Sequence, residues 1–280
     1  MEQERKFTLS LRYYNVVLQP ATFHDTDYYK KLMRQVFQNE RAIVTATDKA
    51  TKMRGLDESN DMMIGHLVNY SILSSKNWYD DNADTIIEHD TDPNLYPNAR
   101  EWEFYFMPET HRMAVVVKKG LSWGQFETYL NKAFKVACES LGYDDAVLNR
   151  ITSTNGIEAI YSLDTISSLD IEVCYSNNDN NDEYTEAIDD EFKSSNVSRM
   201  KAKVIGTSHH PIQLKKEGNS LLNSLLILSK NNGFAKAKGK IGKKAKTINT
   251  RDYPVVTKLT KVTDSNMTER IRQSFDSLTA

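Results

Sequence analysis

Lysine alternates with small or apolar residues along residues 234–246, and this period of two constrains the fold more than any other feature of the chain. The alternating lysines are Lys236, Lys238, Lys240, Lys244 and Lys246. In an extended chain, successive side chains point to opposite faces of a sheet. The pattern therefore predicts a pair of strands with lysines on one face and small, packed residues on the other.

Two interpretations of this lysine pattern stay open. Lysine protects exposed sheet edges against aggregation, so one interpretation is a solvated sheet face. The other is a nucleic-acid-binding face, because several lysines on one surface neutralise phosphates. The charge is distributed unevenly along the chain. Residues 201–261 contain 14 lysines and arginines but only two acids, a net charge of +12, whereas the rest of the chain has a net charge of −14. Such asymmetry says more about partners than the overall charge of −2 does.

Hydrophobic periodicity predicts an α+β protein. Strands are expected at 7–18, 62–73, 102–106, 113–117, 170–175, 200–205, 234–247 and 255–262, and helices at 25–37, 122–141, 184–192, 220–230 and 267–278. Asp25 is expected to cap the first helix, and Ser122 with Gln125 forms a capping-box pattern for the second. Residues 45–60 are polar, charged and poorly periodic, which predicts a loop that carries a short helix or strand.

The order of these elements predicts two domains. Residues 1–150 run strand, helix, strand, aromatic hairpin, helix, which suits a ferredoxin-like antiparallel sheet with helices on one face. Residues 151–280 repeat this plan loosely, with an antiparallel or mixed sheet that contains the lysine-rich strands and a terminal helix. The boundary is expected in a loop at residues 149–155.

Composition limits the class of protein. The apolar content of 39% is typical of a folded, soluble chain, and no apolar run approaches the roughly 18 residues of a membrane helix. The charged start of the chain lacks the apolar segment of a signal peptide, so the cytoplasm is the expected location. Cys138 and Cys174 are expected to be buried free thiols, and no metal or cofactor is predicted.

The sequence contains no strong catalytic motif. GxxxxGK[ST], GxGxxG after a strand, GxSxG and HExxH are all missing. The nearest pattern is Asp170 with Glu191-Phe192-Lys193, which resembles that of metal-dependent nucleases, but the second part falls in a predicted acidic helix rather than a strand. A nuclease is thus the least favoured function. His209 and His210, which follow the strand at 200–205, are expected in a turn.

Two acidic stretches carry weaker predictions. Residues 80–92 are interpreted as a solvated acidic loop, because they lack the glycine and terminal glutamate of a calcium loop. The run from Asp179 to Glu191 holds seven acids and favours a solvated helix face. The alternative for this run is that it docks on the lysines and regulates binding.

The lysine-rich strands therefore supply the predicted site. Lysine makes point-charge contacts with phosphate, whereas base recognition favours arginine, asparagine and glutamine, so we expect DNA binding with little sequence preference. Phe234 and Tyr253 are expected in the core, although either could stack on unpaired bases. The predicted nucleic-acid-binding residues are Lys201, Lys203, Lys236, Lys238, Lys240, Lys243, Lys244, Lys246 and Arg251.

The arrangement of the chain is similar to that of a known family. The hairpin and helix in EWEFYFMPETHRMAVVVKKGLSWGQFETYL, the segment SSLDIEVCYS, the lysine-rich strands and the final helix follow one another as in the Rex exclusion protein A family of phage lambda. The chain also resembles a family of bacterial proteins that contain segments like LRYYNVVLQP and NNGFAKAKGK. The resemblance implies a two-domain, dimeric, DNA-binding protein of antiphage defence without an enzymatic centre.

The resemblance supplies no catalytic or binding residue. The alternative function is a protein-interaction or regulatory subunit of a defence system, whose basic face binds an acidic partner.

Overall fold

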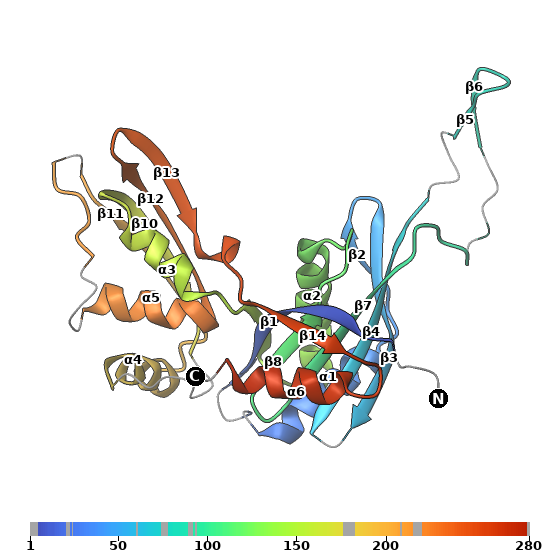
Figure 1. Cartoon of the computed structure of the whole chain (residues 1–280), viewed down its shortest axis with the longest axis horizontal. Helices are drawn as coiled ribbons and strands as arrows, with labels where there is room; N and C mark the ends of the chain where they lie inside the picture. Colours follow the sequence, from blue (N-terminus) through green and yellow to red (C-terminus); the bar gives the residue numbers. More distant parts are fainter. Residues whose placement is uncertain are drawn as a thin grey trace.

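Two antiparallel sheets, side by side in Figure 1, organise the chain. The computed structural model describes residues 5–20, 23, 25–59, 61–73, 78–88, 92, 94–175, 183–207, 209–214 and 220–278. Helices and antiparallel strands occur together throughout this part, which confirms the α+β prediction. None of its helices combines the length and the apolar character needed to cross a membrane.

The large sheet has the strand order β14-β1-β8-β7-β4-β3-β2, and β9 pairs with the second half of β1. Its strands are β1 (Phe7–Gln19), β2 (Ile43–Ala46), β3 (Lys49–Ser59), β4 (Met62–Ser71), β7 (Arg100–Met107), β8 (Arg112–Val116), β9 (Asp145–Arg150) and β14 (Val256–Val262). β2, β3 and β4 pair in chain order, and β7 pairs with β8, whereas β1 pairs with β8, β9 and β14 from later in the chain. Every pairing in this sheet is antiparallel, as expected.

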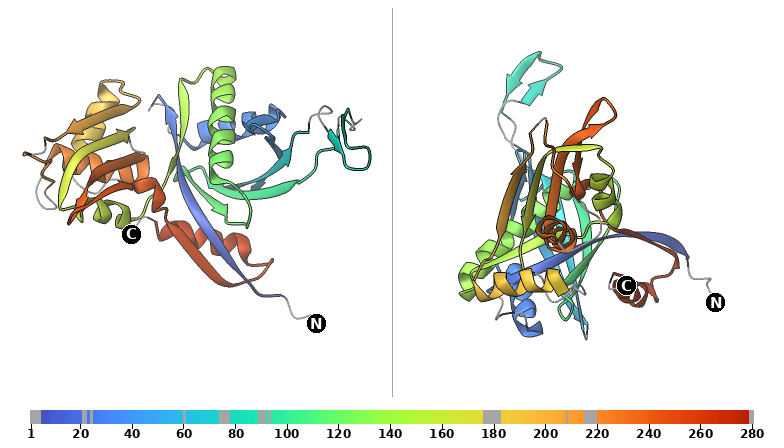
Figure 2. Two further views of the ribbon diagram at one scale, coloured as in Figure 1. Left: turned by 90° about the horizontal axis from the view of Figure 1, so that it is seen from above. Right: turned by 90° about the vertical axis from the view of Figure 1, so that its left-hand side faces the viewer.

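Helices cover both faces of the large sheet. Along β1, Tyr14, Val16 and Leu18 face a core shared with α1 (Thr26–Gln38) and α2 (Trp123–Leu141). The alternate residues Leu11 and Tyr13 face the other way, toward α6 (Met267–Asp276). Figure 2 shows α6 and α2 on opposite sides of β1. The expected helical face is therefore formed by α1 and α2, and the C-terminal helix adds a second one.

The small sheet has the order β11-β10-β12-β13 and is covered by helices on one face. Its strands are β10 (Thr165–Val173), β11 (Met200–Ile205), β12 (Gly233–Ile241) and β13 (Lys244–Asn249), and the helices beside it are α3 (Thr154–Tyr161), α4 (Glu183–Ser194) and α5 (Leu221–Asn232). Ala235 and Ala237 are fully buried in a core that also contains leucines of α5. Small side chains on β12 let the helix approach closely, as the alternation predicted.

Buried contacts join the two sheets. Val17 of β1 belongs to the core of the small sheet, and Asn15 Nδ2 donates a hydrogen bond to Asn232 Oδ1 at 2.8 Å. After β13, the chain passes through a 3-10 turn (η2, Thr250–Asp252) and returns to the large sheet as β14 and α6. The small sheet therefore lies within residues 165–249, which differs from the expected assignment of residues 151–280 to one unit.

Several elements were not predicted from the sequence. Residues 45–60, expected to be a loop with one short helix or strand, include the end of β2 and the whole of the long strand β3. The expected boundary loop at 149–155 contains the end of β9 and the start of α3. The acidic residues 80–92 were expected to be a loop, but β5 (Trp78–Asp80) and β6 (Thr85–Ile87) form a two-stranded ribbon there. Figure 1 shows this ribbon projecting from the large sheet.

Both cysteines are buried free thiols, as predicted.

Candidate nucleic-acid interface

The lysines of β12 lie on the face of the small sheet that faces away from α5. Ala235 and Ala237 are buried, so the alternating Lys236, Lys238 and Lys240 point to the outer face. Lys238 and Lys240 are exposed, and Lys236 is half-buried. The alternation in the sequence thus gave the correct orientation for this strand.

The lysines of β13 have the opposite orientation. Gly242 and Lys243 form the two-residue turn between β12 and β13, and Gly242 has a φ of 57°, which suits the first position of a type II′ turn. This turn pairs Lys244 with Ile241 and Lys246 with Gly239. Directly paired residues share a face, so Lys244 and Lys246 point away from the outer face. The expectation of one lysine surface across both strands was therefore wrong for these two residues.

Strand β11 brings a second pair of lysines to the outer face. Lys203 pairs with Asp170 and Lys201 pairs with Glu172 on β10, and β10 lies between β11 and β12. We call this surface the basic face and define it by five lysines. They are Lys201, Lys203, Lys236, Lys238 and Lys240.

Two carboxylates on β10 lie among these lysines. Glu172 accepts from Arg199 Nη1 at 3.1 Å and is 3.3 Å from Lys201 Nζ. Asp170 pairs in register with both Lys203 and Lys236, yet it has no ion pair in the described part of the chain. With Arg199 and Arg251, the basic face has seven cations against two carboxylates, a net charge of +5. Arg199 and the two carboxylates were not predicted as part of this surface, because only the strand order places β10 between the two basic strands.

A hollow of about 550 Å³ lies at the end of the basic face near the β12–β13 turn, and we call it the distal hollow. Its lining residues are Thr165, Ser167, Thr207, Pro211, Lys238, Gly239, Lys240, Ala245, Lys246 and Thr247. This lining contains three lysines and four hydroxyl groups but no acid. Gly239 shapes it, because a Cβ at this position would lie 2.1 Å from the Thr165 carbonyl oxygen. Lysine ammonium and hydroxyl groups are donors that suit phosphate oxygens.

At the other end of the basic face, Arg251 covers Phe234. The guanidinium carbon lies 3.8 Å from the centre of the ring, so Phe234 presents a cation–π pair instead of a bare ring. Burial lowers the pKa of Arg251 from its ordinary value. Arg150 holds this turn in place: its Nη1 donates to the Arg251 carbonyl oxygen at 2.6 Å, and its Nη2 donates to Glu127 Oε1 at 2.6 Å.

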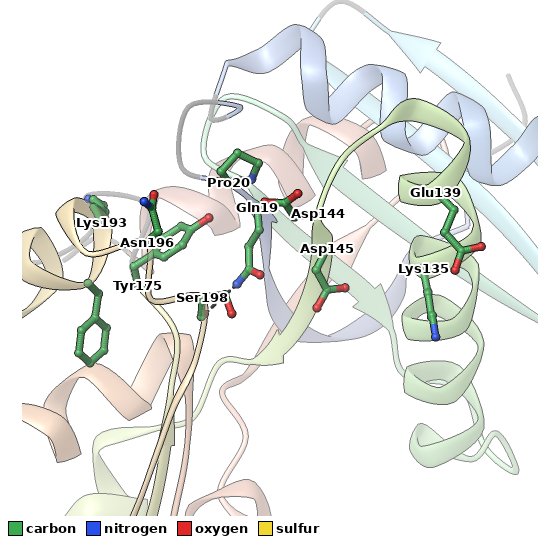
Figure 3. Close-up of a pocket in the computed structure, with 11 residues that line it drawn as sticks. Gln19, Pro20, Lys135, Glu139, Asp144, Asp145, Tyr175, Lys193, Asn196 and Ser198 are labelled. Carbon is green, nitrogen blue, oxygen red and sulfur yellow. Dashed lines mark hydrogen bonds between the residues drawn. The ribbon is translucent and has the colours of Figure 1, made fainter.

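A second hollow, of about 640 Å³, lies between the two sheets (Figure 3). Figure 3 shows Glu139, Asp144 and Asp145 on the side of the large sheet, and Lys193 on the opposite side. The lining also includes Lys135, so carboxylates outnumber cations. This hollow therefore repels phosphate more than it attracts it, in contrast to the distal hollow.

The nuclease pattern is not assembled into one site. Asp170 lies on the outer face of the small sheet, whereas Glu191 belongs to α4. Phe192 of α4 is buried in the core beneath α5, so this helix lies away from the basic face. Lys193 forms an ion pair with Asp189 at 2.8 Å within α4. The described residues contain no cluster of three or more His, Cys, Asp or Glu able to hold a metal ion.

The histidine pair, the two aromatic residues and the acidic run lie at separate places in the fold. His209 and His210 are exposed in a bend after β11, as predicted, and the His210 backbone N–H donates to Thr207 Oγ1 at 3.0 Å. The Phe234 side chain is half-buried on the outer face, and Tyr253 packs against the core of the small sheet. Asp179 and Asp182 of the acidic run lie outside the described residues, and α4 contains the rest.

Comparison with known proteins identifies the family. A comparison with curated proteins gave no match. A family model described as a domain of unknown function (DUF4747) matches residues 7–278, which is nearly the whole chain. The chain therefore belongs to the DUF4747 family.

Proposed function

We propose that this protein is a non-catalytic nucleic-acid-binding protein that holds DNA on the basic face with little sequence preference. The observation that carries the proposal is the gathering of five lysines on one sheet face, which none of the described helices covers. Each lysine that neutralises a phosphate releases counterions, which gives affinity without base recognition. The donor-lined distal hollow supplies a place where the contacts with phosphate are densest.

A role in antiphage defence is part of this proposal and is supported by the resemblance to the Rex exclusion protein A family. A defence protein that must bind any invading DNA benefits from contacts to the backbone rather than to the bases, because phosphates carry no sequence information. The net charge of +5 on the basic face favours this mode of binding.

Gel retardation of DNA at low salt tests the proposal. We expect Lys236→Glu, Lys238→Glu and Lys240→Glu in one chain to abolish retardation, because three attractive charges become repulsive. The matched control is Lys258→Glu with Lys261→Glu, two exposed lysines on β14 of the large sheet, outside the basic face and the distal hollow, and it should keep most of the retardation. Equal retardation by the triple variant and the wild type, with both folded by circular dichroism, would rule out the basic face.

The second candidate function is a protein-interaction or regulatory subunit. It is favoured by Asp170 and Glu172, which interrupt the lysines and would repel a continuous run of phosphates. Purification from the native host separates the two candidates. Absorbance at 260 nm that nuclease treatment removes supports nucleic acid, whereas a stoichiometric polypeptide that the triple variant loses supports an acidic protein partner.

A further inference from the structure

The ribbon formed by β5 and β6 exposes apolar side chains to solvent. Tyr79 and Ile86 pair directly across the ribbon, and 59% and 69% of their surface is exposed. Leu95, which follows the ribbon in the chain, is 71% exposed. We call residues 78–88 the arm. A two-stranded ribbon is marginally stable in water unless another surface covers its apolar face, so the arm is suited to a contact with another molecule.

The arm is also strongly acidic. Residues 78–88 contain Asp80, Asp81, Asp84 and Glu88 but no lysine or arginine. Its complement is therefore a surface with an apolar floor and a basic rim.

A surface of that kind lies on the large sheet, between the end of α1, β2 and α2. It is a groove of about 430 Å³ whose floor includes apolar side chains and whose rim carries three cations and one carboxylate. The apolar residues are Val36, Ala42, Ile43, Tyr129, Ala133 and Val136, and the charged ones are Arg41, Lys132, Lys135 and Glu139. We call it the α1–α2 groove. β2 is the last strand of the sheet, so the groove opens at the edge of the sheet.

We propose that the arm of one copy docks in the α1–α2 groove of a second copy, so that the protein is a homodimer. Tyr79 and Ile86 would cover the apolar floor, while the carboxylates of the arm meet Arg41, Lys132 and Lys135. All views in Figures 1 and 2 show the arm standing apart from α2 of its own chain, so a second copy is the occupant. A two-fold axis makes both contacts at once, because each copy offers one arm and one groove.

The basic face is a poorer partner for the arm. It is also cationic, but Ile205 is the one large apolar side chain exposed on it among the described residues, because Phe234 is already covered by Arg251. A single isoleucine would leave most of the apolar pair on the arm exposed. In the proposed dimer the basic face remains open, so dimerisation and DNA binding use different surfaces.

Light scattering coupled to size-exclusion chromatography tests the proposal on the full chain. We expect wild-type protein at micromolar concentration to have twice the 32.1 kDa mass of one chain. Tyr79→Ser with Ile86→Ser should weaken association more than tenfold and give the mass of one chain. Because the arm projects from the body, the two substitutions should leave the fold of each chain intact, and the variant should have the melting temperature of the folded, undimerised chain.

Charge exchange shows where the arm docks. Asp81→Lys with Glu88→Lys on the arm, or Arg41→Glu with Lys135→Glu in the groove, should each give monomers, and all four changes in one chain should restore the dimer. The proposal is overturned if the wild type is a monomer or if the arm variant is a dimer. It is also overturned if the chain with all four substitutions stays a monomer. Loss of the dimer in the variant with Lys238→Glu and Lys240→Glu would place the arm on the basic face instead and would also overturn it.

Discussion

At the scale of single residues, Asp170 weakens the field of the basic face. Its carboxylate lies in register between Lys203 and Lys236 and has no ion pair in the described part of the chain. A phosphate bound to either lysine is therefore repelled by a neighbouring negative charge. We expect Asp170→Asn to raise DNA affinity by about fivefold at low salt, because two unit charges about 4 Å apart in water interact by about 1 kcal/mol.

Fluorescence anisotropy with labelled DNA measures this change. Asp264→Asn, in the exposed turn before α6, is the control and should leave the affinity unchanged. An affinity of Asp170→Asn equal to that of the wild type would mean that DNA does not approach this part of the sheet.

The buried thiols of Cys138 and Cys174 should lower the free energy of unfolding in alkaline solution. Burial raises the pKa of Cys138 and of Cys174 from the ordinary value of 9.0 to about 12. The folded protein therefore holds these protons at a pH where the unfolded chain releases them, so stability is full below pH 9 and falls as the pH rises toward 12. We expect urea unfolding at pH 8 and pH 10.5 to show this loss, and Cys138→Ala with Cys174→Ala to reduce it. A double variant with the same pH dependence as the wild type would contradict the assignment.

At the scale of elements, helix caps differ between the two helices that cover the large sheet. Asp25 Oδ1 accepts a hydrogen bond from the Asp27 backbone N–H at 2.8 Å, so α1 has the cap that the sequence predicted. Ser122 begins α2 but makes no side-chain cap, so the expected capping box is not formed. We expect Asp25→Ala to cost about 1 kcal/mol of unfolding free energy and Ser122→Ala clearly less, measured by urea denaturation. Equal losses would contradict this difference.

Local pattern predicted the strands and helices that contain one strong period. Alternation placed Lys236, Lys238 and Lys240 on one face, and the aromatic hairpin of Trp102 and Phe104 was found where expected. The orientation of Lys244 and Lys246 depended on the length of the turn before them, since a shift of one residue reverses every side chain of a strand. Sequence periodicity carries no information about that register.

The acidic strand between the two basic strands could not be predicted either. Asp170 and Lys203 are 33 positions apart, and Asp170 and Lys236 are 66 positions apart, so only tertiary pairing brings them together. The polar strands β2 and β3 were expected only as a short element within a loop, for a related reason. β3 pairs with β4 and β2 pairs with β3, so pairing stabilises both strands although their own residues have little periodicity.

At the scale of the whole molecule, the C-terminus completes the large sheet. Leu259 of β14 pairs with Leu9 of β1, and Ile271 and Phe275 of α6 cover the same face. We expect a fragment of residues 1–150 to expose this apolar surface and to aggregate or to bind the dye ANS, because the residues that cover it are removed. A monomeric fragment with cooperative unfolding would show that the first 150 residues fold alone.

The salt dependence of DNA binding tests the central claim most directly. The slope of log K against log salt counts the phosphates that the protein neutralises, at about 0.7 to 0.9 per contact. We expect Lys238→Gln with Lys240→Gln to reduce this slope by about 1.5, because both residues line the distal hollow on the basic face. Lys258→Gln with Lys261→Gln removes the same charge from the exposed surface of β14, outside the basic face and the distal hollow, and should change the slope by less than half as much. Equal slopes for the two variants would contradict the assignment of DNA binding to the basic face.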